Sequence, residues 1–301
     1  MIRGKSDVVF DTVNAILLTV VIVAVAYPLY FVLIASVSDP DLVNTGQVWA
    51  WPRTPSLLAY REVFRHERVW TGYTNSAFYL GIGTTINVTL VICAAYGLSR
   101  RKLPGRGLIM GVFVFTMYFG GGLIPTFILV KDLGIVDTRW ALLLPRAVNV
   151  FNLIIARTFF QATIPDELYE AAYMDGCSDS RLFVSVVLPL SKPIIAVIAL
   201  YSAVWHWNQY FDALVFLPRA RDLHPLQMVL REILIIGEQM STTTAVSGMS
   251  SAELEQVARL ARMAETMKYA LIIVASLPLL FAYPFVQRHF VKGVMIGSLK
   301  G

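Results

Sequence analysis

Six long apolar segments alternate along the chain with shorter polar ones. An α-helix needs about 20 predominantly apolar residues to cross the hydrocarbon core of a bilayer, and each segment approaches or exceeds that length. The pattern therefore predicts an all-α membrane protein with six transmembrane helices in a single domain, residues 1–301. The predicted spans are residues 12–35, 76–98, 108–130, 140–160, 193–217 and 269–286.

Polar or helix-breaking residues interrupt three of these spans. Gly120 to Gly122, followed by Pro125, predict a break in the third span, either as a hinge or as a place of close helix packing. The fourth span contains polar residues and the fifth ends in a polar, aromatic series, neither of which lipid accommodates cheaply. We expect both to line a protein interior or a water-filled pathway.

Lysine and arginine predict the orientation, because short cytoplasmic loops carry an excess of them. They collect before the first span, after the second and after the sixth, whereas the alternate loops balance their charges. Both termini and the loop of residues 161–192 are therefore predicted to be cytoplasmic. The residues that carry this argument are Arg3, Lys5, Arg100, Arg101, Lys102, Arg106, Arg288, Lys292 and Lys300.

The external segment of residues 218–267 is longer than a simple connector. Leu254, Val257 and Ala261 recur in it at helical spacing. They predict a short external helix over about residues 252–264.

The cytoplasmic loop has the pattern of a helix, a turn and a second helix. Pro165 suits the first helical position, and Gly176 can end the helix in the left-handed conformation. Ser178 or Asp179 can cap the next helix. The first helix would have one small apolar face and a wider, partly acidic one, as expected of a helix that docks. These faces comprise Leu168, Ala171 and Ala172 on one side and Tyr169, Glu170, Tyr173 and Met174 on the other.

Composition supports the membrane assignment. Charged residues make up 15% of the chain, against roughly 25% in ordinary soluble domains. Apolar content of 56% excludes a disordered chain and makes a soluble enzyme improbable. The chain has a net charge of +5. Its basic residues lie at the ends of apolar runs and do not form a patch of the kind that binds nucleic acid. The two cysteines support neither a disulfide framework nor a metal site.

The cytoplasmic loop resembles the EAA signature of ABC importer permeases, the membrane subunits of binding-protein-dependent transporters. Its core differs from the signature only at Val186, where isoleucine is usual. The resemblance implies the type I ABC importer permease fold, with a cytoplasmic coupling helix between spans four and five that inserts into an ATPase subunit. The ATPase-coupling residues that it implies are Glu170, Ala171, Ala172, Asp175, Gly176, Leu188 and Pro189.

Further motifs look like those of the carbohydrate-uptake permeases, which include the second maltose-type permease and permeases for complex plant or alginate-like oligosaccharides. They are Gly120–Pro125, Trp140–Pro145, Trp207-Asn208-x-Tyr210 and residues 292–301. The resemblance implies a multi-pass subunit of the bacterial inner membrane that translocates a sugar or oligosaccharide. A permease for a non-sugar solute is the alternative.

The same resemblance implies the partners. They are a second permease, two cytoplasmic ABC ATPase subunits and an extracytoplasmic solute-binding protein. ATP and Mg²⁺ would bind to the ATPase subunits, and this chain would hold no cofactor or metal and catalyse no reaction.

A substrate pathway for sugar needs aromatic faces for the C–H surface and polar groups for the hydroxyls. The fourth and fifth spans contain residues of both kinds, and a structural role is the alternative to a pathway role for each kind. The aromatic residues could form an interfacial belt, and the polar residues of the fourth span could bond helix to helix. The candidates are Trp205, Trp207, Asn208, Gln209, Tyr210, Asp212, Arg146, Asn149 and Asn152.

Two rival functions explain less of the sequence. An intramembrane enzyme would need converging catalytic groups, but His206 and Asp212 have no HExxH or nucleophile motif beside them. A secondary transporter should show internal repeats and paired intramembrane charges. Neither rival accounts for the cytoplasmic loop.

Overall fold

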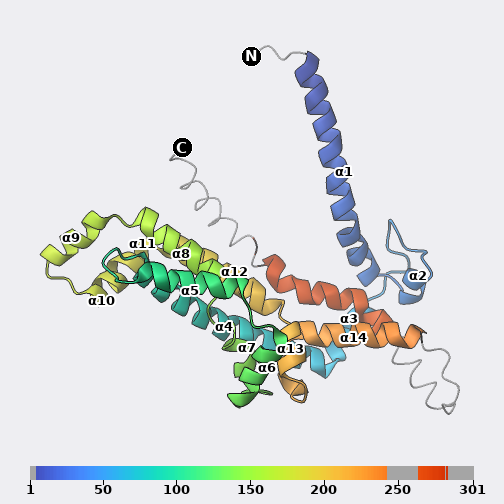
Figure 1. Cartoon of the computed structure of the whole chain (residues 1–301). Coiled ribbons are helices and arrows are strands. Elements are labelled where there is room, and N and C mark those ends of the chain that lie inside the picture. Colours follow the sequence, from blue (N-terminus) through green and yellow to red (C-terminus); the bar gives the residue numbers. More distant parts are fainter. Residues whose placement is uncertain (1–4, 243–263, 282, 284–301) are drawn as a thin grey trace. The chain divides into compact units, whose positions relative to one another are not determined.

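The computed structural model describes residues 5–242, 264–281 and 283, and Figure 1 shows their arrangement. These residues form helices and connecting segments, with no β-strand among them. The chain divides into two compact units, one of residues 1–69 with 230–277 and one of residues 70–229 with 278–301. The helix predicted over residues 252–264 and most of the basic C-terminal tail lie outside the described residues.

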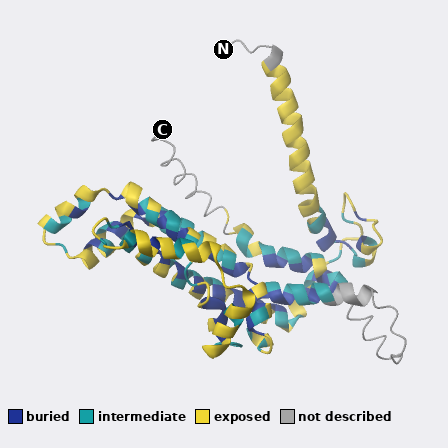
Figure 2. Ribbon diagram, in the orientation of Figure 1, coloured by how far each residue is buried: buried dark blue, intermediate teal, exposed yellow. Residues whose placement is uncertain are grey.

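The first unit contains α1, two short helices and most of two longer ones. Its core is a small cluster at the end of α1, where Ile34 and Ala35 pack with Val43 and Val48. Most of α1 is exposed along its apolar length (Figure 2), which suits a helix surrounded by lipid. The helices of this unit are α1 (Lys5–Ser36), α2 (Pro40–Asn44), α3 (Leu58–Arg65) and the helix Ala264–Phe281.

The second unit is a bundle around α4, which begins in the first unit. Helix α14 also contains residues of both units, most of them in the first. The helices are α4 (Glu67–Ser99), α5 (Arg106–Tyr118), α6 (Leu123–Asp132), α7 (Trp140–Leu143), α8 (Val150–Thr163), α9 (Asp166–Met174), α10 (Asp179–Leu182), α11 (Leu188–Leu190), α12 (Lys192–Trp207), α13 (Phe211–Phe216) and α14 (Leu226–Thr242), with a π turn at Phe183–Val187 and a 3₁₀ turn at Arg221–Leu223.

Among the described residues, three helices are long and apolar enough to cross a membrane, namely residues 7–36 of α1, α4 and Ala264–Phe281. Two bent pairs would raise the number to five. The α5–α6 pair bends by 113°, and Gly122 has a φ of +87° at the bend, where the glycine run predicts a break. The helix α10–α11 meets α12 at 78°.

The predicted fourth and fifth spans are both divided into shorter helices. Residues 140–160 form α7 and part of α8, separated by a segment that contains Pro145. Asn149 caps α8, because its side-chain oxygen accepts a hydrogen bond from the Asn152 amide at 3.0 Å. The fifth segment is helical to Trp207 and again from Phe211.

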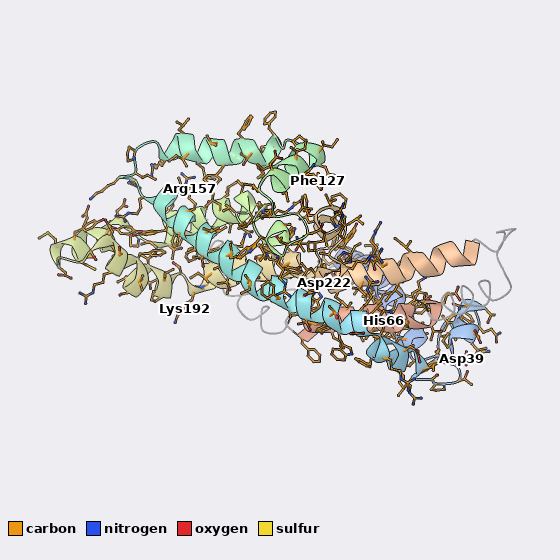
Figure 3. The ribbon with its side chains drawn as sticks, turned by 90° about the horizontal axis from the view of Figure 1, so that it is seen from below. Asp39, His66, Phe127, Arg157, Lys192 and Asp222 are labelled. Carbon is orange, nitrogen blue, oxygen red and sulfur yellow. The ribbon has the colours of Figure 1, made fainter. Side chains whose placement is uncertain are left out.

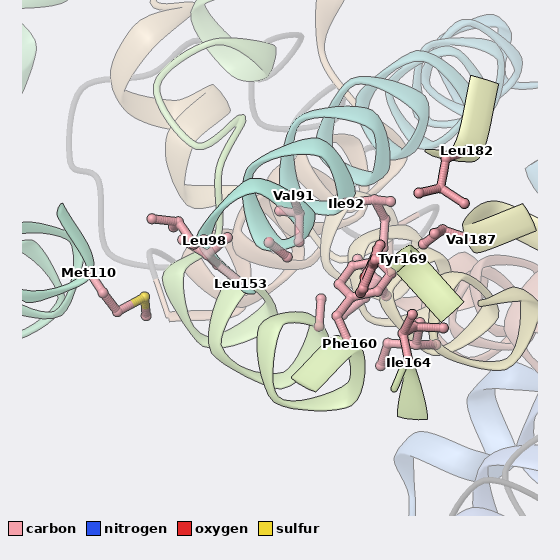
Figure 4. Close-up of a cluster of buried hydrophobic side chains, with 14 residues drawn as sticks. Val91, Ile92, Leu98, Met110, Leu153, Phe160, Ile164, Tyr169, Leu182 and Val187 are labelled. Atoms are coloured by element: carbon pink, nitrogen blue, oxygen red, sulfur yellow. The ribbon is translucent and has the colours of Figure 1, made fainter. Parts of the chain in front are cut away.

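A large buried cluster of the second unit joins the bundle to the loop of residues 161–192 (Figure 4). Val91 and Ile92 come from α4 and Phe160 comes from α8. Tyr169 of α9 and Leu182 of α10 complete the same cluster. Helices α9 and α10 therefore pack onto the bundle through apolar contacts.

Candidate functional site

The loop of residues 161–192 folds as the helix, turn and helix that its sequence predicts. Gly176 has a φ of +71°, the left-handed conformation that glycine adopts without a Cβ penalty. The amide of Cys177 donates to the Ala172 carbonyl at 2.9 Å and closes the turn. Ser178 caps α10. Pro165 lies one position earlier than predicted, at the N-cap of α9.

The two faces of α9 differ from those predicted on a helical wheel. Tyr169 is only 7% exposed, and Leu168 and Ala172 are partly buried against the bundle. The inward face is therefore aromatic as well as small. The exposed stripe, called here the α9 outer face, comprises Glu167, Glu170, Ala171 and Met174.

A network around Arg100 holds α9 to the end of α4. The guanidinium carbon of Arg100 lies 3.4 Å from the centre of the Tyr169 ring. Arg100 Nη2 donates to the Tyr173 hydroxyl at 2.8 Å, and that hydroxyl donates to Asp179 Oδ1 at 2.7 Å. The hydrogen bond to Asp179 is the main cause that raises the pKa of Tyr173, and burial adds to it. One arginine thus links α4 to both loop helices.

Arg101 and Lys102 add to this network. Arg101 Nη1 lies 3.3 Å from Asp166 Oδ2, and Lys102 Nζ lies 4.9 Å from the centre of the Tyr173 ring. In the sequence this basic run indicates only the orientation of the chain. Its role in holding the loop is a tertiary feature that the linear pattern does not reveal.

The remaining coupling candidates lie on the exposed side of the loop or beside its second helix. Asp175 and Pro189 are exposed, whereas Leu188 packs against the buried cluster. Pro189 has no N–H to donate to the carbonyl of Ser185, which lies inside the π turn. Proline therefore explains why the helix widens at this point.

Four of the nine pathway candidates line one cavity of about 590 Å³. It lies in the second unit, among residues of α4, α5, α8 and α12 and of the segment between α7 and α8. Its residues are Asn87, Met117, Pro145, Arg146, Val148, Asn149, Val150, Phe151, Asn152, Tyr201, Ser202, Trp205 and His206.

An ion pair lies beside this cavity. Arg146 Nε is 3.0 Å from Asp212 Oδ2, and the Arg146 guanidinium lies 5.6 Å from the centre of the Trp205 ring. Gln209 Nε2 donates to Asp212 Oδ2 and to the Leu142 carbonyl, both at 3.3 Å. The Arg146 side chain is 58% exposed, whereas that of Asp212 is 10% exposed. The arginine therefore has surface left for a solute.

The other candidates are divided between a second cavity and the core. Asn208 and Tyr210 line a cavity of about 570 Å³ that also includes Arg146 and Asp212. Trp207 is 2% exposed and packs edge-on against Tyr73, with ring centres 5.4 Å apart. Its environment is that of a core residue.

The part of the chain that the structure describes contains no group of three or more histidine, cysteine or acidic side chains arranged to hold a metal ion. Arg157, which is labelled in Figure 3, makes a structural hydrogen bond in the second unit. Its Nε donates to the Leu98 carbonyl at 3.1 Å and ties α8 to the end of α4.

Long apolar helices, with cavities that both polar and apolar side chains line, are features of membrane transport subunits. The model of the family described as "Binding-protein-dependent transport system inner membrane component" matches residues 1–296, and the chain belongs to this family.

Relatives and a solved structure agree with this assignment. The chain is 43% identical to the polygalacturonan/rhamnogalacturonan transport system permease protein YtcP of Bacillus subtilis, over 91% of this chain and 92% of that one. It is 39% identical to protein LplC of the same organism, over 100% and 98%. A crystal structure of a bacterial ABC transporter that imports the acidic polysaccharide alginate contains a chain with a TM-score of 0.85 and 32% identity, with 96% and 99% coverage.

Proposed function

We propose that this chain is a permease subunit of an ATP-driven importer, and that a solute-binding protein delivers an acidic oligosaccharide to it from outside the cell. A second permease completes the pathway, and two cytoplasmic ATPase subunits bind ATP and Mg²⁺. The family description supports the binding-protein-dependent mechanism. Both termini and the α9 loop would face the cytoplasm.

The α9 outer face carries the coupling part of this proposal. Glu167, Glu170, Ala171 and Met174 follow the spacing i, i+3, i+4, i+7 and form one stripe along the helix. Met174 is 88% exposed, which is unusual for an apolar side chain unless a partner covers it. The opposite face is held to the bundle. The outer face would therefore dock on an ATPase subunit, with Ala171 permitting close approach and Glu170 making a polar contact.

For Ala172 we propose a role in packing, in place of the close approach to an ATPase subunit that the resemblance implies. This residue packs against the buried cluster on the inward side of α9, so we assign it to the fit between α9 and the bundle. Asp175 and Gly176 would set the direction in which the outer face points.

The acidic character of the substrate is supported by two comparisons. YtcP is described as a polygalacturonan/rhamnogalacturonan permease, and the solved alginate transporter acts on an acidic polysaccharide. In this chain, Arg146 presents exposed N–H groups between the two cavities. A uronate carboxylate would receive hydrogen bonds from them in competition with Asp212.

Replacement of Glu170 by lysine tests the docking face. Glu170→Lys puts a cation where an anion would meet the ATPase, and the loss of a charged partner at such a contact costs about 2 to 5 kcal/mol. We expect normal membrane insertion but loss of uptake and of substrate-stimulated ATP hydrolysis. Asp132→Lys makes the same charge change on an exposed position of α6 and should transport like the parent. Normal stimulated hydrolysis in Glu170→Lys would refute the docking role.

The substrate class is tested by uptake into proteoliposomes that contain the assembled complex and its binding protein. We expect import of a radiolabelled galacturonate trisaccharide and not of raffinose, a neutral trisaccharide. Import of raffinose alone would refute the acidic substrate but retain the saccharide permease. Import of neither would refute a role in oligosaccharide transport.

A further inference from the structure

Three residues that line the 590 Å³ cavity each have a buried polar atom without a hydrogen-bond partner. These atoms are Asn87 Oδ1, Ser202 Oγ and His206 Nδ1. The three residues are 4%, 4% and 2% exposed. No hydrogen bond to these atoms is present among the described residues, and the His206 ring lies close to the Gln209 side chain. They come from α4 and α12, two helices that are far apart in the sequence.

Such atoms are uncommon in folded proteins, because an unsatisfied buried polar group costs about 1 to 3 kcal/mol. Folding alone therefore gives no reason to keep three of them on one cavity wall. Asn87 is held in place at its other end, where Nδ2 donates to the Ala147 carbonyl at 3.0 Å. Its oxygen is thus positioned and still unused.

The position of His206 depends on a glycine. A Cβ added to Gly83 would overlap the imidazole at Nε2 and Cε1. A glycine in α4 lets the ring lie against the helix backbone, while Nδ1 keeps no partner. The local packing therefore fixes a polar atom that it does not satisfy.

The chemistry of this wall suits hydroxyl groups. An amide oxygen accepts a hydrogen bond, a serine hydroxyl both donates and accepts, and a neutral imidazole nitrogen does one or the other. Aromatic side chains of Tyr201 and Trp205 line the same cavity and offer flat apolar surface for the C–H face of a sugar ring. The volume lies within the range of about 300 to 1,000 Å³ that is usual for small-molecule sites.

We infer that Asn87, Ser202 and His206 form a subsite that binds hydroxyl groups of one sugar unit, while the nearby Arg146 binds a carboxylate. The inference rests on the proposed function, since it assigns a part of the cavity to the same substrate. It adds residues that the pathway candidates do not include. In this arrangement the three neutral side chains bind hydroxyl groups, and the Arg146 guanidinium binds the carboxylate.

The assembled complex with bound galacturonate trisaccharide, visualised in a lipid nanodisc, tests the subsite directly. Sugar hydroxyls within hydrogen-bond distance of at least two of the three atoms would support the inference. Three other outcomes would overturn it: water molecules alone at these atoms, side chains of the second permease bonded to them, or a trisaccharide bound elsewhere.

Ser202→Ala separates a binding role from a structural one. An unpartnered hydroxyl contributes nothing to the unliganded fold, so its removal should leave the thermal midpoint of the complex unchanged or raised. The rate of trisaccharide uptake should fall by about 2- to 10-fold, the equivalent of one neutral hydrogen bond. Unchanged uptake would contradict the subsite, and so would a lowered midpoint with a proportional loss of uptake.

Two glycine variants give a matched comparison for His206. Gly83→Ala should displace the imidazole and reduce uptake, whereas Gly81→Ala, where a Cβ meets nothing within 4 Å, should behave like the parent. Equal uptake by the two variants would contradict the role of His206. A complex that imports neither trisaccharide refutes the proposed function, whereas normal import by all three variants refutes the subsite alone.

Discussion

Replacement of Arg100 by glutamine should release α9 from the bundle without unfolding the bundle. The variant loses a guanidinium that lies 3.4 Å from the Tyr169 ring and donates to the Tyr173 hydroxyl at 2.8 Å. A hydrogen bond with a charged donor contributes about 1.5 to 3 kcal/mol, and an exposed cation–π contact about 0.5 to 1 kcal/mol. Arg100 is only partly buried, so solvent screening reduces the total to about 2 kcal/mol.

That loss corresponds to about a 30-fold increase in the population of the open loop. Amide hydrogen exchange measures it, because local opening sets the exchange rate of protected amides. We expect faster exchange at residues 169–174 in the Arg100→Gln complex and little change at Val91 and Ile92, which lie in the buried cluster.

Arg106→Gln is the control, since it removes the same charge from the same basic loop. Among the described residues, no hydrogen bond, ion pair or ring contact of Arg106 links it to α9. Equal exchange in the two variants would refute the Arg100 network and leave only the general effect of charge. Arg100→Lys should restore part of the protection, because lysine keeps the charge but lacks the planar fork.

Three further predictions follow from local geometry. Gly176→Val should abolish uptake, because a β-branched residue in the left-handed conformation costs about 1 to 2 kcal/mol and reorients α9; uptake equal to that of the parent would place the bend elsewhere. Trp207→Ala should lower the thermal midpoint and the yield of the complex whatever the substrate, because loss of a buried tryptophan costs about 3 to 5 kcal/mol; a stable variant with altered substrate preference would contradict its core position. Asp212→Asn should free Arg146 and lower the concentration of galacturonate trisaccharide that gives half-maximal uptake, and an unchanged concentration would argue against carboxylate binding at Arg146.

Local chemistry explains which parts of the loop could be predicted from the sequence. Gly176 and Ser178 act on the backbone within a few residues of themselves, so their positions are sufficient to predict a turn and a cap. The glycine run at the α5–α6 bend is local in the same sense. These features can therefore be predicted without the tertiary structure.

The face of α9 that turns inward could not be predicted in this way. Tyr169 and Tyr173 look like solvent-facing amphipathic residues on a wheel, but their partners, Tyr96 and Arg100, lie about 70 residues earlier. Only the tertiary fold brings them together. The place of Ser202 and Asn87 in the cavity wall could not be predicted for the same reason. Each is an ordinary polar residue in the sequence, and only the fold brings α4 and α12 together around a cavity.

The divided fourth span had a local signal of a different kind. Asparagine, here Asn149, is a favoured residue at a helix N-cap, and Pro145 precedes it. From their residue types, both Asn149 and Asn152 are candidates for the pathway. The structure shows that Asn149 begins a helix and also lines the cavity, so the two roles are compatible.

The docking loop and the cavity are connected by two uninterrupted helical stretches. On α4, Asn87 lies about 18 Å along the axis from Ser99, the last residue of the helix, which Arg100 follows directly. Helix α8 runs from the cavity at Asn152 to Phe160 in the cluster with Tyr169. The Arg157 bond to Leu98 ties the two helices together. Bending either helix between these points would strain a closely packed core, so a displacement of α9 should move the cavity wall as a unit. The Arg100→Gln variant tests this step as well: because it releases α9 from the end of α4, ATP hydrolysis should continue while trisaccharide uptake falls, and normally coupled uptake in this variant contradicts it.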